Sequence, residues 1–167
     1  MFQRHGFLIV LLFVIFVGIT NGSEKMLSEN INAWGSGVWG NSYASKTIDS
    51  SGLLSDIHDE DYSHMWLTES NDSESQCHAN QDTSLGSAWI WYKFDKIYEV
   101  QSLKIWNYNQ TDYKDRGLRN VTIEYSLDGD SWLKVGDYEI NQANSQGTYS
   151  QTINLGVDAK NIVITAH

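Results

Sequence analysis

Two residue types are absent or nearly so in this chain of 167 residues, and each absence narrows what the protein can be. There is no proline and only one cysteine, Cys77, so no disulfide within the chain can stabilise the fold. Stability must come from a buried apolar core, with or without a metal ion. Cys77 lies in a polar segment with no partner cysteine, and we interpret it as an incidental thiol, with a nucleophile or an intermolecular disulfide as the alternatives.

Basic residues are also scarce. The chain has 11 lysines and arginines against 21 aspartates and glutamates, which gives a net charge of -10. Proteins that bind a phosphate backbone depend on basic side chains to displace its counterions. The acidic balance therefore argues against nucleic acid and against anionic membrane surfaces as partners.

The one long apolar run lies at the N-terminus. A basic start at Arg4 is followed by apolar residues from Phe7 to Val17 and by small residues at Thr20 and Gly22. Because a membrane-spanning helix needs ~20 apolar residues, the pattern predicts a signal peptide over residues 1–22, cut after Gly22, with an uncleaved anchor as the alternative. Cleavage would leave ten basic and 21 acidic residues, a charge of -11. We therefore expect a secreted, extracellular protein that does not insert into the membrane after cleavage.

Helical periodicity is missing, and alternation takes its place. Residues 88–94, 100–108 and 118–126 alternate apolar and polar side chains, as strands with one buried face do. In the first of these segments the expected core face is Ala88, Ile90, Tyr92 and Phe94. Further strands are expected at residues 65–67, from Trp132 onward, at 148–155 and at 161–165. Short strands joined by turns predict an all-β, antiparallel sandwich or barrel.

The first half is polar and less regular. Residues 23–32 are interpreted as a polar approach, and residues 33–41, with three glycines, as a loop. Residues 50–84 are mostly polar, apart from the apolar island at 65–67, and residues 69–87 are expected to be the most mobile part. The domain organisation that follows is a signal peptide at 1–22, an N-terminal approach segment at 23–42 and one sandwich at 43–167.

Several ordered motifs carry a resemblance to a known family. They are Met65-Trp66-Leu67-Thr68, Trp89-Ile90-Trp91-Tyr92-Lys93-Phe94-Asp95, Trp106-Asn107-Tyr108-Asn109-Gln110 and, most specific, Tyr-Ser-x-Asp-Gly-x-x-Trp at 125–132. In the last motif, Asp128-Gly129 suits a tight turn that fixes strand register. Over residues 44–164 the chain resembles the discoidin (coagulation factor C-type, F5/8 type C) domains, which are grouped with the family 32 carbohydrate-binding modules.

The resemblance implies an antiparallel β-sandwich (jelly roll) of the galactose-binding-domain-like kind. It also implies a binding module that is not an enzyme, with carbohydrate, a glycan or polysaccharide, as the expected partner. Members of the family usually continue beyond the strand that matches residues 162–165 with a Gly-rich loop and a Glu-bearing strand. We therefore expect this sandwich to lack its last strand.

The loop after the second alternating strand is the first candidate for a sugar site. Sugar recognition needs an aromatic face for the C–H surface of a pyranose and planar polar groups for its hydroxyls. Tyrosines of this loop can stack, and its amides and arginine can hydrogen-bond, whereas a histidine just before Trp66 can replace the family's hydroxyl donor. The carbohydrate-binding candidates are His64, Tyr108, Asn109, Gln110, Tyr113 and Arg116.

Each of these candidates has a structural alternative. The loop can be a solvated connection in which Asn107 and Asn109 bond the backbone, as asparagine often does in turns. His64 can be a structural histidine. The charged residues 58–61 can line the same cleft or form a solvated loop, and we favour the solvated loop.

A calcium ion is the one cofactor that the resemblance suggests. Asp49 falls where the family places a calcium-ligating aspartate, and Ser51 could add a hydroxyl oxygen. The usual Asp-Gly is replaced here by Asp49-Ser50, and the family's distal glutamate has no counterpart. A turn-forming aspartate is the alternative interpretation.

Two other functions remain open at this point. Discoidin relatives also bind proteins through the same loops, so a protein-binding adhesion module of a larger extracellular protein is the alternative to sugar binding. A hydrolase is disfavoured because the sequence has no Gly-x-Ser-x-Gly elbow and no phosphate loop, and its histidines lack metal-ligand spacing.

Overall fold

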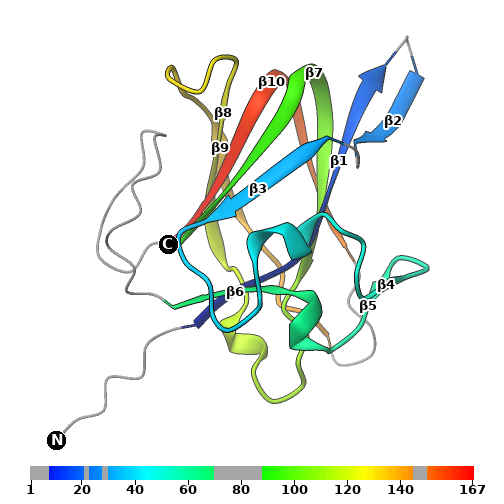
Figure 1. The fold of residues 1–167 in the computed structure, drawn as a ribbon, viewed down its shortest axis with the longest axis vertical. Helices are drawn as coiled ribbons and strands as arrows, with labels where there is room; N and C mark the ends of the chain where they lie inside the picture. The colour runs from blue at the N-terminus through cyan, green and yellow to red at the C-terminus, as the bar shows by residue number, and fades with distance from the viewer. Residues whose placement is uncertain (1–7, 21–22, 28–29, 70–87, 145–149) are drawn as a thin grey trace, which may run out of the picture.

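The computed structural model describes residues 8–20, 23–27, 30–69, 88–144 and 150–167 (Figure 1). These residues form strands and three short 3-10 turns, which confirms the all-β prediction. No helix among them is long and apolar enough to cross a membrane. The elements are β1 (Leu8–Thr20), β2 (Ser23–Leu27), β3 (Ile31–Gly35), η1 (Ala44–Thr47), β4 (Leu53–Leu54), β5 (Ile57–His58), η2 (Tyr62–His64), β6 (Trp66–Glu69), β7 (Trp89–Asn107), η3 (Lys114–Arg116), β8 (Asn120–Ser126), β9 (Leu133–Glu139) and β10 (Gln151–Ala166).

Two long strands, β7 and β10, belong to both layers of the sandwich. Their paired outer parts, with β3, β8 and β9, form the order β3-β7-β10-β8-β9, which we call sheet I. The other halves of β7 and β10 also pair with each other, and β7 then pairs with β1. The far side of β1 pairs with β6 and β2. These strands form sheet II. All of these pairings are antiparallel. The sequence predicts two strands where each long strand runs, and the structure joins them through register shifts, one of them at Gly156 with φ +61°.

The core lies between the two sheets. The four residues expected on one face of 88–94 are all at most 2% exposed, which confirms that alternation. Phe16 of β1 completes this core, with its ring 5.0 Å from Tyr92 and 5.2 Å from Phe94, centroid to centroid. The hydroxyl of Tyr92 donates to Thr47 Oγ1 at 3.0 Å, and burial raises the pKa of that tyrosine.

A second apolar cluster covers the outer face of sheet II. Met65, Leu67, Trp106 and Tyr108 pack together there, with Leu53 of β4 against them. The Trp106 indole donates to the carbonyl of Asp56 at 3.1 Å, in the turn between β4 and β5. The predicted buried island at 65–67 is therefore confirmed.

The hairpin between β8 and β9 is built as its sequence predicts. Gly129 has φ +94°, a conformation that glycine adopts without strain. Asp128 Oδ1 accepts the backbone N–H groups of Asp130 and Ser131, each at 2.9 Å, and these bonds hold the pKa of Asp128 at about 2. The Trp132 indole donates to the Gly129 carbonyl at 3.0 Å, which fixes the ring across the turn.

The N-terminal region departs from expectation. Residues 33–35 were expected in a loop, but they belong to β3, because Ile31 and Ala33 face the core and the strand pairs with Phe94 through Ile90 of β7. The apolar run of the expected signal peptide forms β1, paired along β7. Its removal after Gly22 stays a prediction. Of the expected mobile segment, Glu69 ends β6, and residues 70–87, with Cys77 among them, lie outside the described residues.

Candidate functional site

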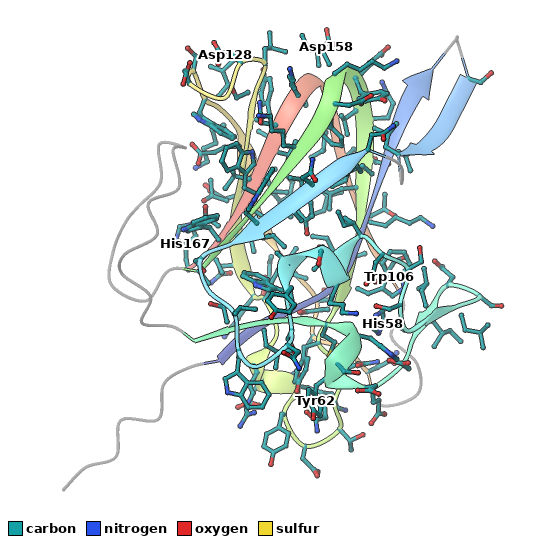
Figure 2. The ribbon with its side chains drawn as sticks, in the orientation of Figure 1. His58, Tyr62, Trp106, Asp128, Asp158 and His167 are labelled. Atoms are coloured by element: carbon teal, nitrogen blue, oxygen red, sulfur yellow. The ribbon has the colours of Figure 1, made fainter. Side chains whose placement is uncertain are left out.

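Three loops meet at the lower end of the sandwich, where Tyr62 is labelled (Figure 2). They are the residues after β3 up to η1, the stretch from β4 to η2, and the connection through η3. The Asn109 side-chain amide donates to the His58 carbonyl at 2.8 Å, and Thr111 Oγ1 donates to Glu60 Oε2 at 3.1 Å. Ser42 Oγ donates to the Tyr62 carbonyl at 3.1 Å. Side-chain bonds thus join segments that lie far apart in sequence into one surface.

Large aromatic side chains project from these loops. Tyr43 and Tyr62 are each 52% exposed, Trp39 is 42% and Tyr113 is 41%. The rings of Trp39 and Tyr62 meet edge to face with centroids 6.0 Å apart. Sequence reasoning chose only Tyr113 of these four. Trp39, Tyr43 and Tyr62 could have been found as aromatic residues in polar loops, because such loops have no strand face to bury them.

The η3 turn presents Tyr113 together with Arg116. The Arg116 N–H bonds to the Tyr113 carbonyl at 3.0 Å, and the guanidinium lies 4.0 Å from the centroid of the Tyr113 ring. A cation over an aromatic face holds both side chains in place. This pair offers a ring surface beside several N–H donors, which is the combination that the sequence predicts.

Asn107 anchors the base of this loop. Its side chain accepts from the Leu118 N–H at 2.8 Å and donates to the carbonyls of Leu118 and Asn141 at 2.7 and 2.9 Å. A Cβ at Gly117 would meet Asn107 Oδ1 at 2.5 Å, so only glycine lets the chain pass there. The structural interpretation of Asn107 is therefore confirmed.

The expected stacking role of Tyr108 is wrong. Its side chain is 1% exposed because it packs with Trp106 and its neighbours on sheet II, and its hydroxyl donates to the side-chain oxygen of Gln110. Burial raises the pKa of Tyr108. Asn109 is 4% exposed and braces the loop against His58, so it has the backbone-bonding role that we gave as the alternative.

The charged residues 58–61 divide into structural and surface groups. His58 is buried, and desolvation lowers its pKa. Asp61 caps η2 by accepting the Ser63 N–H at 2.9 Å, which lowers the pKa of Asp61. Asp59 and Glu60 stay at the surface, where Asp59 Oδ2 holds His64 Nδ1 at 2.8 Å. His64 thus stands at the loop end, oriented by a carboxylate.

A polar pocket of about 390 Å³ opens beside η3. It is lined by Lys114 and Asp115 of η3, by Arg119, and by Glu139 and Asn141 at the end of β9, among others. Arg119 Nε and Glu139 Oε1 are 3.8 Å apart and both side chains are largely exposed, so this ion pair contributes little to stability. Sequence reasoning did not include the residues after β9, which only the fold brings beside η3.

Asp49 and Ser51 lie together in a turn. Asp49 Oδ1 accepts the Ser51 N–H at 2.8 Å, and Oδ2 lies 3.4 Å from Lys46 Nζ. Both carboxylate oxygens therefore have protein partners, as a turn-forming aspartate would. Among the described residues there is no group of three or more His, Cys, Asp and Glu side chains that could hold a metal ion. Calcium at Asp49 and Ser51 stays a prediction.

Comparison with known proteins places the fold. No protein-family profile and no curated protein matches the chain. A CBM32 module of Clostridium perfringens, solved in complex with GalNAc-β-1,3-galactose, aligns with a TM-score of 0.57 at 16% identity over 83% of this chain and 85% of its own. The family 32 CBM of C. perfringens NanJ, solved with galactose, aligns at 0.56 and 15% over 92% and 88%. The chain therefore has the fold of the family 32 carbohydrate-binding modules, an antiparallel galactose-binding-like β-sandwich.

Proposed function

We propose that this protein is a secreted, non-catalytic module that binds carbohydrate through the loop end of its sandwich. The observation that supports the proposal most is the gathering of exposed aromatic rings and hydrogen-bonding side chains on loops that side-chain bonds hold together. Rigid loops at one end of a sandwich are a common place for binding residues.

The chemistry fits a pyranose. Tyr113, with Arg116 at its ring, offers a face for the C–H surface of a sugar and donors for vicinal hydroxyls. His64 and Asp59 offer a donor and acceptor pair on the neighbouring loop, which Glu60 joins to Thr111. Because the whole chain carries a net charge of -10, we expect neutral sugars to be preferred over acidic ones.

Calorimetric titration of the purified protein tests this proposal. The sugars to use are galactose and GalNAc-β-1,3-galactose, which neighbours of the same fold were solved with. Replacing Tyr113 by alanine removes a ring that a stacked sugar would cover. If that contact hides roughly 60 Å² of apolar surface, the loss is ~1.5 kcal/mol, or about tenfold in affinity.

Ile97→Ala is the matched control. Ile97 is 51% exposed in the bend of β7, and its replacement by alanine should leave the affinity for sugar unchanged. Binding of neither sugar, nor of any glycan on an array, would contradict the proposal. If the Tyr113→Ala protein binds the sugars as tightly as the unsubstituted protein, the loop end is not the sugar-binding site.

One observation also suits a protein-binding adhesion module. Tyrosine and tryptophan are enriched at protein interfaces, and Trp39, Tyr43 and Tyr62 are exposed together on adjoining loops. A polypeptide captured by the protein, and not displaced by the sugars above, would favour this second function. Loss of that capture in Trp39→Ala would assign it to these loops.

A further inference from the structure

The outer face of sheet I carries a row of side chains that the loop site does not use. Trp34 of β3 pairs with Trp91 of β7, and Val163 of β10 lies opposite Trp91. Val163 in turn pairs with Glu124 of β8, and Glu124 with Lys134 of β9. The row therefore crosses all five strands. With neighbouring strands ~4.8 Å apart, it extends over roughly 19 Å.

The apolar half of this row is separate from the core. Ile90 and Tyr92 point inward from β7, so Trp91 between them points outward. The ring of Trp91 lies 5.3 Å from that of Trp34 and 6.1 Å from that of Trp132, centroid to centroid. Trp132 packs on Val163 beneath them, and Trp34 is 44% exposed. Indole rings on a solvent-facing sheet surface contribute nothing to the packing between the sheets.

The polar half of the row holds an acceptor without a donor. Within the part of the chain that the structure describes, Glu124 Oε2 of the row and Thr165 Oγ1, two residues along β10 from Val163, are buried and have no hydrogen-bond partner. Glu124 is 5% exposed and Thr165 is 1%, and both point to the outer face on neighbouring strands. Burial raises the pKa of Glu124. A buried polar atom without a partner lowers stability, so such atoms commonly indicate a missing ligand or water.

We propose that this face is a second carbohydrate site, one that binds a chain of neutral sugars laid across the strands from Trp34 toward Lys134. A sugar hydroxyl supplies the donor that Glu124 lacks, and the pyranose C–H faces cover Trp34 and Trp91. For a hydroxyl to reach Glu124, the side chain of Lys134, its cross-strand neighbour, has to leave Asp137, with which its Nζ pairs at 2.7 Å. The net charge of -10 disfavours acidic glycans here as it does at the loop end.

The length of the row distinguishes this site from the loop end. A single sugar can fill a loop site, whereas a row of roughly 19 Å needs several linked sugars. The test is affinity electrophoresis of the full chain through gels that contain β-1,4-galactan, mixed-linkage β-glucan or galactomannan. We expect retardation by at least one of them, reduced about tenfold in apparent affinity by Trp34→Ala and partly restored by Trp34→Phe.

Two further variants keep the proposal open to refutation. Glu124→Gln preserves size but changes the acceptor, and it should weaken binding to the polysaccharide while leaving galactose binding unchanged. Tyr113→Ala should weaken galactose binding and leave polysaccharide binding unchanged, so the two proposed sites are tested separately. Retardation by none of the polymers, or equal retardation of the Trp34→Ala protein, would overturn the proposal. Self-association that Trp34→Ala abolishes would also overturn it, because the face would then bind a second copy.

Discussion

Replacement of Phe16 by alanine tests the most unexpected feature of the fold, the place of the apolar N-terminal run in sheet II. Phe16 is fully buried between Tyr92 and Phe94. Truncation of a buried phenylalanine costs about 3–5 kcal/mol, from lost transfer energy and from the cavity that remains. In a domain of ~150 residues each kcal/mol shifts the melting temperature by roughly 2–4 °C, so we expect a fall of about 6–20 °C.

The assays are thermal melting and urea unfolding of protein made in the cytosol, where no signal peptidase acts, with intact mass confirmed by mass spectrometry. Leu133→Ala is the control, because Leu133 is 60% exposed and its truncation should change stability by less than ~0.5 kcal/mol. If Phe16→Ala leaves the urea midpoint where it was, β1 is not part of the folded core.

Removal of residues 1–22 extends the same reasoning. β2 and β6 pair with β1 in sheet II, so both lose this partner when it is absent. We expect the shortened chain to be destabilised by more than the Phe16→Ala protein. Equal stability of the shortened and full chains would show that the apolar run acts as a leader alone.

Three more predictions concern the turns and loops. Asn107→Ala removes bonds to Leu118 and Asn141 and leaves buried backbone groups unpaired, so a loss of about 2–4 kcal/mol is expected in urea unfolding; full stability would contradict the anchoring role. Gly129→Ala has room for the new carbon, with Asn161 Nδ2 at 3.7 Å, but must hold φ +94°, so a loss of roughly 1 kcal/mol from backbone strain is expected in thermal melts. The pKa of Asp128, lowered to about 2, means that its contribution to stability is full above pH ~4 and is lost as the pH falls toward 2. Asp128→Asn should therefore flatten the pH dependence of stability between pH 4 and 2, and an unchanged slope would exclude Asp128 as its source.

Much of the fold could be predicted from the sequence because strand alternation is a local property. The inward residues of 88–94 follow from period two alone, and the Asp128-Gly129 turn follows from its backbone preference. The polar bend between residues 94 and 100 looked like a loop between two strands. The structure shows one strand continuing through it, with a register shift at which the pairing to β10 passes from Lys93 directly to Tyr98.

The candidate site could be predicted only in part. Tyr113 and Arg116 lie in the loop between two predicted strands, as expected, and they meet as a pair. By strand alternation Tyr108 points to the same outer face of β7 as Trp106, so the sequence predicts that it is exposed. The structure shows that Met65, Leu67 and Leu53 cover this face. The rings of Trp39 and Tyr62 meet where Ser42 donates to the Tyr62 carbonyl, 20 positions further along the sequence. No local sequence pattern contains such a contact.

The claim that a sugar binds at the loop end is tested most directly by nuclear magnetic resonance of the isotope-labelled protein during titration with galactose. The account predicts that the amide signals of Tyr113 and Arg116, and of Tyr62 and His64 on the adjoining loop, shift together and saturate. The signals of Asp128 and Asp158, at the opposite end of the molecule in Figure 2, should stay in place. Saturable shifts confined to that opposite end, or no saturable shifts with any neutral sugar, would contradict it.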